Sequence, residues 1–186
     1  MLLFAAVLLL FPAYQKAPPS TTPSLQAEAC HKFVQGFYDW YLPKMANGGM
    51  EQVFKHRPSF FTPALVRAFD EESVLQNRHP DLVGALDFDP FLDTQDPYDH
   101  YIVGDATVTG NNCLVNVYGA PGGNKNAKPD VVAEVVQVNG TLRFANFHYK
   151  DEKGKESDII GMLRASKKEW MALETKEHRS RTKKPH

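Results

Sequence analysis

Cysteine is scarce in this chain: its 186 residues include only Cys30 and Cys113. This scarcity excludes a small fold held together by several disulfides. Neither cysteine has a second Cys or a His beside it at the spacing of a zinc site, so the cysteines do not look like metal ligands. We expect no bound metal, and no motif indicates a cofactor. In an oxidising compartment the two residues are able to form one disulfide, and two separate buried thiols are the alternative.

The chain also lacks a strong net charge and an apolar run long enough to cross a membrane. Its formal net charge is −1, whereas a nucleic-acid-binding protein is usually basic overall or over one face, so we expect no nucleic-acid partner. The apolar run Leu2–Phe11 has the length of a signal-peptide core and is too short for a membrane span. We therefore predict an exported protein, periplasmic or secreted, that meets the membrane only through its signal or an anchor.

The expected organisation is one domain between two short flanking segments. Residues 1–17 are the predicted signal peptide, although no Lys or Arg precedes the apolar run, and a short buried helix is the alternative. A lipid anchor at Cys30 fits less well, because polar residues separate it from the apolar run and Glu28 lies close before it. Residues 18–28 are expected to form a flexible linker, residues 29–175 the folded domain, and residues 176–186 a basic, disordered tail.

Helical patterns occupy the first part of the predicted domain. Residues 33–42 carry aromatic side chains at helical spacing, and Pro43 follows them. A second helix is expected from Pro63 to about Asn77, because Thr62 is a good N-cap and proline is favoured at the first helical position. The domain is therefore expected to begin with helices.

The second half of the chain changes to the alternating pattern of strands. Gly110 and the pair Asn139–Gly140 are turn signals between antiparallel neighbours. A last helix is expected to start near Ser157. Four strands are predicted, at residues 101–106, 113–118, 131–138 and 142–149. Helices followed by an antiparallel meander and a C-terminal helix give an α+β fold and argue against a parallel sheet.

Residues 86–97 form an unusual segment, in which four aspartates are interleaved with Phe and Leu. A calcium loop is one explanation, but Leu92 stands where that loop needs Gly, and Tyr98 stands where it needs Glu. Acid–base chemistry is a second explanation. A carboxylate among Phe side chains has a raised pKa. The candidate catalytic residues are then Asp39, Asp87, Asp89 and His148, with Tyr38 and Tyr41 in the same cavity.

A structural role is the third explanation of this segment and the one that the pattern favours. Asp89–Pro90 and Asp96–Pro97 each match an aspartate cap followed by proline at the start of a helical turn. In this interpretation the aspartate side chains accept hydrogen bonds from loop N–H groups, and Phe88 and Phe91 close one end of the core.

Three motifs together resemble the DUF3828 family. They are Phe37–Leu42, Leu86–Leu92 with the following Gln95–Asp96, and Phe144–Tyr149. The family looks like a branch of the NTF2-like (SnoaL-type) superfamily of bacterial exported proteins and lipoproteins, and it has no assigned activity. The resemblance covers about residues 30–163. The chain departs from it at Leu142, where an aromatic residue is expected, and this departure concerns the shape of the pocket.

The resemblance implies a cone in which N-terminal helices pack into a bent four-stranded antiparallel meander around an apolar pocket. The residues expected to line that pocket are Phe37, Tyr38, Tyr41, Phe88, Phe91, Phe144 and Asn146.

The favoured function is a non-catalytic, extracytoplasmic module that binds a small apolar ligand or a cell-envelope protein, with a homodimer as one expected form. The alternative is an isomerase, dehydratase or hydrolase that uses an Asp or His base in the cone. NTF2-like folds include both enzymes and binding modules, so the fold alone does not decide between these two functions. Binding to an anionic surface through the basic tail is a third interpretation.

Overall fold

The computed structural model describes residues 23–47, 49–80 and 84–182. The predicted signal peptide and the first part of the predicted linker lie outside the described residues. Within them, no helix is long and apolar enough to cross a membrane.

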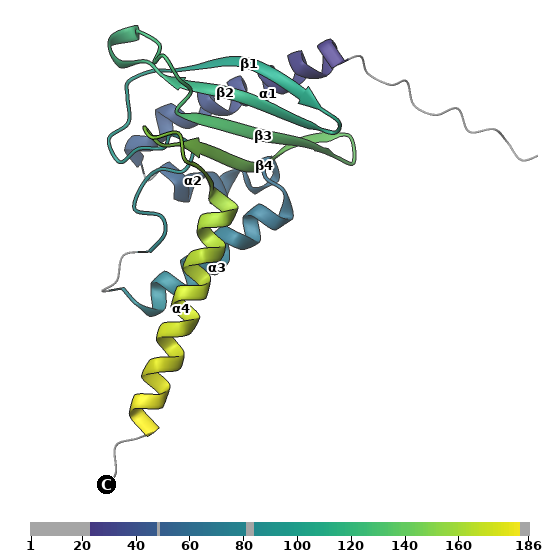
Figure 1. Ribbon diagram of the computed structural model, residues 1–186. Helices are drawn as coiled ribbons and strands as arrows, with labels where there is room; N and C mark the ends of the chain where they lie inside the picture. The colour runs from purple at the N-terminus through teal and green to yellow at the C-terminus, as the bar shows by residue number, and fades with distance from the viewer. Residues whose placement is uncertain (1–22, 48, 81–83, 183–186) are drawn as a thin grey trace, which may run out of the picture.

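The chain folds into helices and one antiparallel sheet, in agreement with the predicted α+β class (Figure 1). Two short 3-10 helices, at Leu42–Asn47 and Pro58–Phe60, connect the first three α-helices. The elements in chain order are α1 (Pro23–Tyr41), α2 (Gly49–His56), α3 (Pro63–Arg78), β1 (Tyr101–Thr109), β2 (Asn112–Gly119), β3 (Val131–Val138), β4 (Thr141–Lys150), β5 (Glu156–Asp158) and α4 (Ile159–Thr182).

The sheet is open and has the order β1-β2-β3-β4-β5, with every neighbouring pair antiparallel. The prediction of four strands is therefore wrong by one. The missing strand β5 is three residues long, polar and without alternation, so it carries no strand pattern. It forms because the end of β4 offers backbone partners, with Tyr149 opposite Ser157. It also delays the last helix from Ser157 to Ile159.

Two boundaries of the predicted domain organisation also need correction. Helix α1 begins at Pro23, inside the expected linker 18–28, because the segment after Pro23 is rich in Leu, Ala, Gln and Glu, which favour helix. Helix α4 runs to Thr182, so most of the expected disordered tail continues this helix. Lys, Arg and Glu are good helix formers, and they extend α4 beyond the region that packs.

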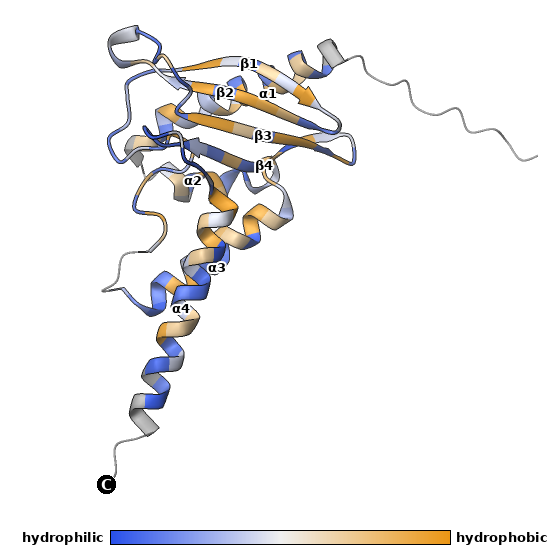
Figure 2. Ribbon diagram, in the orientation of Figure 1, coloured by the Kyte–Doolittle hydropathy of each residue, from blue (hydrophilic) through white to orange (hydrophobic). Residues whose placement is uncertain are grey.

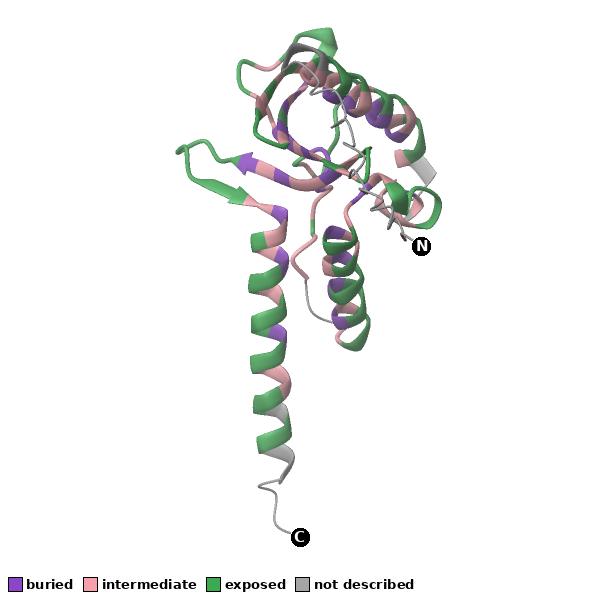
Figure 3. Ribbon diagram, turned by 90° about the vertical axis from the view of Figure 1, so that its right-hand side faces the viewer, coloured by how far each residue is buried: buried purple, intermediate pink, exposed green. Residues whose placement is uncertain are grey.

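Helices α1 to α3 lie on one side of the curved sheet, and α4 starts at the sheet and protrudes away from it (Figure 1). Helix α1 lies against β1 and β2, whereas α3 and α4 pack together near β4 (Figure 1). Side chains of β2 and β3 alternate between buried and partly exposed. Hydrophobic residues follow the strands, and the distal part of α4 is mostly hydrophilic (Figure 2). Buried residues concentrate between the helices and the sheet (Figure 3), which places the core in this layer.

Cys30 on α1 and Cys113 on β2 lie at disulfide distance, with their Sγ atoms 2.08 Å apart. The contact joins the first helix to the middle of the sheet across 83 residues of sequence. Of the two alternatives that the sequence leaves open, the geometry is compatible with the disulfide.

Candidate functional site

The residues expected to line an interior pocket mostly fill the core instead. Phe37, Tyr38, Tyr41, Phe91 and Phe144 are each completely buried. Their rings pack directly on one another: the Phe37 ring lies 5.4 Å from Phe91 and 4.9 Å from Phe144. Aromatic side chains therefore occupy the space where the cone was expected to hold a ligand.

Asp89 is the most constrained of the candidate acids. Its Oδ1 atom accepts a hydrogen bond of 2.9 Å from the backbone N–H of Phe91, and its Oδ2 atom accepts one from the hydroxyl of Tyr41. Burial raises the pKa of Asp89, while the hydrogen bonds from Tyr41 and Phe91 oppose this rise. Both oxygens have partners within the protein, so the structure places Asp89 in a loop-holding role, as the structural interpretation expected.

Two further tyrosines hold the same loop from the core. Tyr38 donates a hydrogen bond of 2.6 Å to the carbonyl of Phe91, and Tyr149 donates one of 2.8 Å to the carbonyl of Pro90. Burial raises the pKa of both hydroxyls well above its usual range, which keeps them protonated as donors. Three hydroxyl groups thus supply hydrogen bonds that a loop lacking regular structure would otherwise miss.

The other candidate aspartates do not join this network. Asp39 is exposed on α1 and accepts a hydrogen bond of 2.7 Å from Gln35. Asp87 is exposed. The expected cap at Asp96–Pro97 does not form, because no helical turn follows Asp96. The backbone N–H of Asp96 donates a hydrogen bond to the hydroxyl of Thr94. Of these candidate acids, Asp89 alone is held by the core, and Asp87 and Asp89 both border an open pocket beside the loop.

His148 and Asn146 also lie elsewhere than the catalytic interpretation required. His148 follows buried Phe147 on β4 and faces the opposite side of the sheet, where its Nε2 atom lies 2.9 Å from a Glu134 carboxylate oxygen. Asn146 donates a hydrogen bond of 2.8 Å to Asp158 and accepts one of 3.3 Å from the N–H of Ile160. Asn146 thereby anchors the start of α4 rather than lining a pocket.

Phe88, the remaining expected pocket residue, is partly buried and does border a pocket, but a shallow one beside the loop. Its ring also packs edge-on against Tyr149, with the centroids 5.7 Å apart. This contact supports the predicted role of Phe88 in closing one end of the core.

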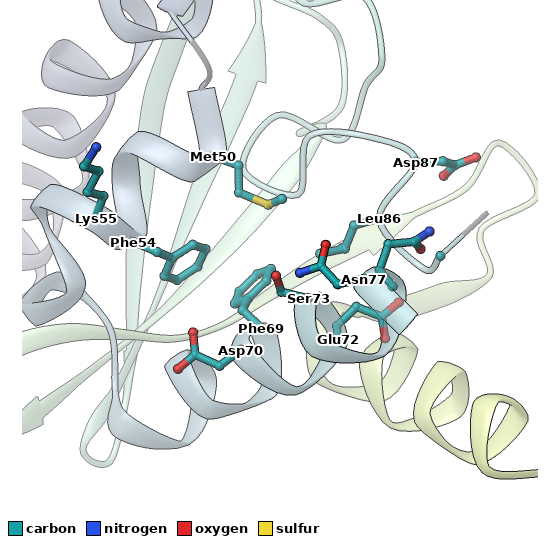
Figure 4. Close-up of a pocket in the computed structure, with 12 residues that line it drawn as sticks. Met50, Phe54, Lys55, Phe69, Asp70, Glu72, Ser73, Asn77, Leu86 and Asp87 are labelled. Atoms are coloured by element: carbon teal, nitrogen blue, oxygen red, sulfur yellow. The ribbon is translucent and has the colours of Figure 1, made fainter. Parts of the chain in front are cut away.

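A predominantly apolar pocket that the sequence did not reveal lies between α2, α3 and the segment 84–87 (Figure 4). Its volume is about 730 Å³, within the range of about 300–1,000 Å³ typical of small-molecule sites. The lining residues are Met50, Phe54, Lys55, Phe69, Asp70, Glu72, Ser73, Gln76, Asn77, Gly84, Leu86 and Asp87.

The buried carboxylate of Glu72 lies at one end of this pocket. Only 4% of Glu72 is exposed. Its Oε1 atom accepts hydrogen bonds of 2.9 Å from the N–H of Ala85 and of 3.0 Å from the hydroxyl of Ser166 on α4. One feature of the sequence could have indicated that Glu72 is buried. It follows Phe69 by three positions and so lies on the same buried face of α3.

We compared the chain with protein-family models, with curated proteins and with solved structures, and none of them matches it. Among the described residues, no three His, Cys, Asp or Glu side chains are grouped so that they could hold a metal ion. The geometry of the pocket is therefore the basis for a functional proposal.

Proposed function

We propose that this protein is a non-catalytic binding module that holds a small, largely apolar molecule in the pocket between α2 and α3. The observation that carries the proposal is the pocket itself. Met50, Phe54, Phe69 and Leu86 give it apolar walls, while Ser73 and Asn77 add polar groups. A mostly apolar cavity with a few polar groups is the usual form of a small-molecule site.

We further propose that the protein is exported to the periplasm or secreted. The apolar run Leu2–Phe11 has the length of an export-signal core. Cys30 and Cys113 at disulfide distance also suit an oxidising compartment, where such bridges persist.

A relationship to the NTF2-like cone and to the DUF3828 family is also part of this proposal. Helices on one face of an antiparallel meander support it, as does the hydrogen-bonded position of Asp89 within the motif 86–92. The extra strand β5 and the filled interior are the points at which the chain differs from the expected cone. In this proposal the binding site has moved from the interior to the side of α3.

Binding of N-phenyl-1-naphthylamine, a fluorophore that brightens in apolar sites, tests the proposed function. Ser73 is exposed on the pocket side of α3, so Ser73→Trp should fill the pocket without disturbing the core. We expect this variant to bind the fluorophore at least about tenfold more weakly than the wild type, a loss of about 1.4 kcal/mol.

Val74→Trp is the matched control, because Val74 is 51% exposed and is not among the residues that line this pocket. It should bind the fluorophore as the wild type does, and both variants should keep the wild-type melting temperature. Equal binding by Ser73→Trp and the wild type would place the site elsewhere. A wild type that does not bind at all would contradict the proposed function.

A further inference from the structure

Building on the proposed function, we propose that the ligand is a cationic amphiphile. Its apolar chain lies along Phe54, Phe69 and Leu86, and its protonated amine lies at the end of the pocket occupied by Glu72 (Figure 4). Two observations support this choice: the hydrogen bonding of Glu72 and the charges around the pocket.

The first observation is that only one of the two carboxylate oxygens of Glu72 has hydrogen-bond partners. Oε1 receives the two hydrogen bonds from Ala85 and Ser166, whereas the buried Oε2 atom has no hydrogen-bond partner among the described residues. A buried acceptor without a donor costs about 1–3 kcal/mol, and more when it is charged. Because Oε2 is enclosed as well as unpartnered, the Glu72 side chain must turn toward the pocket for a ligand to meet it. An ammonium group, with three N–H donors and a positive charge, then supplies what Oε2 lacks.

The second observation is the sign of the charge around the pocket. Three carboxylates line it, at Asp70, Glu72 and Asp87, against the single ammonium group of Lys55. Figure 4 shows Lys55 at the opposite end of the pocket from Glu72 and Asp87. A ligand carboxylate at the Glu72 end would therefore face like charges, which disfavour binding, while an amine there would face opposite ones.

Competition among three probes with the same chain tests the proposal on the full-length protein at pH 7. Dodecylamine, dodecan-1-ol and dodecanoate should each displace N-phenyl-1-naphthylamine below their aggregation concentrations. We expect dodecylamine to act at a concentration at least about tenfold lower than dodecanoate, because charge-assisted hydrogen bonds contribute about 1.5–3 kcal/mol. Dodecan-1-ol, which donates one hydrogen bond without charge, should fall between them.

Two substitutions locate the preference. Glu72→Gln keeps an oxygen for Ala85 and Ser166 but removes the charge, so dodecylamine should lose its advantage over dodecan-1-ol. Ser73→Lys adds a positive charge at an exposed lining position and should narrow the difference between dodecylamine and dodecanoate, with Ser73→Gln as its neutral control. Because Ser73 is exposed, this second pair reports on the charge preference even if Glu72→Gln does not fold.

The outcomes separate this inference from the proposed function. If the three probes displace the fluorophore equally well, or if Ser73→Lys and Ser73→Gln show the same difference between dodecylamine and dodecanoate, the cationic ligand is excluded while the apolar binding site stands. If Glu72→Gln folds and keeps the full preference for dodecylamine, Glu72 is not the partner of the amine and the proposal fails. If neither the fluorophore nor any probe binds the wild type, the proposed function itself fails.

Discussion

The hydroxyl of Tyr41 donates a hydrogen bond to the carboxylate of Asp89, which joins the end of α1 to a loop 48 residues further along the chain. The same carboxylate accepts a hydrogen bond from the N–H of Phe91. One aspartate therefore fixes the turn of its own loop and attaches that loop to the core. This arrangement explains why the acidic segment contains aromatic residues: they belong to the core, and the carboxylate holds the loop on them.

Removal of the Tyr41 hydroxyl should destabilise the fold. In Tyr41→Phe the partly buried carboxylate of Asp89 loses this hydrogen bond, which should cost about 1 kcal/mol of unfolding free energy. Urea denaturation would measure the loss. Tyr98→Phe is the control, because Tyr98 is 37% exposed and should change stability by less than about 0.5 kcal/mol. Equal stability of Tyr41→Phe and the wild type would show that this hydrogen bond does not hold the loop.

Asp93 should make stability depend on pH. Partial burial of its carboxyl group, with a contribution from Asp130, raises its pKa from 3.8 to about 6. A carboxyl group with a higher pKa in the folded state binds its proton more tightly there, so its effect on stability turns unfavourable as pH rises from about 4 to 6. The backbone of Asp93 has a φ of 53°, which asparagine tolerates well.

Asp93→Asn should therefore match the wild type in melting temperature near pH 3.5 and exceed it at pH 8. Thermal unfolding of both proteins across this range gives the difference directly. A constant difference at every pH would mean that Asp93 titrates equally in the folded and unfolded chains.

The bond between Cys30 and Cys113 should stabilise the protein strongly. In the chain-entropy model, a bridge across 83 residues contributes about 4.5 kcal/mol. The double variant Cys30→Ser/Cys113→Ser should lose a similar amount in urea denaturation under non-reducing conditions. The wild type under a reducing agent should show the same loss. Mass spectrometry after alkylation of the unfolded, unreduced protein supplies the direct check, since two alkylated thiols would disprove the bond.

Trp170 should be the main residue that holds α4 on α3. It is 5% exposed and stacks on the ring of His79, with the centroids 5.0 Å apart. Trp170→Ala should cost about 3 kcal/mol of unfolding free energy. Met171→Ala changes the next residue, which is 57% exposed, and should change stability by less than about 0.5 kcal/mol. Similar effects of the two substitutions would show that α4 does not depend on this contact.

The sequence predicted those features that depend on local pattern. The four strands of the meander correspond to β1–β4, and Thr62 caps α3 by accepting a hydrogen bond of 3.3 Å from the N–H of Leu65. The hairpin signal at Asn139–Gly140 is confirmed by positive φ angles at both residues, 51° and 79°, as this type of turn requires. Local backbone chemistry is sufficient for each of these predictions.

The sequence could not predict features that arise between distant segments. Strand β5 depends on a free edge of β4, and the pocket depends on how α2 and the segment 84–87 meet α3. The error about the interior has a related cause. The pattern of Phe37 and Phe91 shows that both face inward, but it does not show whether inward-facing rings leave a space or fill it.

The hydrogen bonds of Glu72 have a thermodynamic consequence for α4. One carboxylate oxygen of Glu72 accepts hydrogen bonds from the hydroxyl of Ser166 on α4 and from the backbone N–H of Ala85 in the segment 84–87. Helix α4 and this segment therefore share a single acceptor. Any ligand that binds Glu72 more tightly when α4 is docked must, by reciprocity, favour the docked helix to the same extent. In the proposed complex, occupancy of the pocket and docking of α4 would thus be linked through the two oxygens of one carboxylate group.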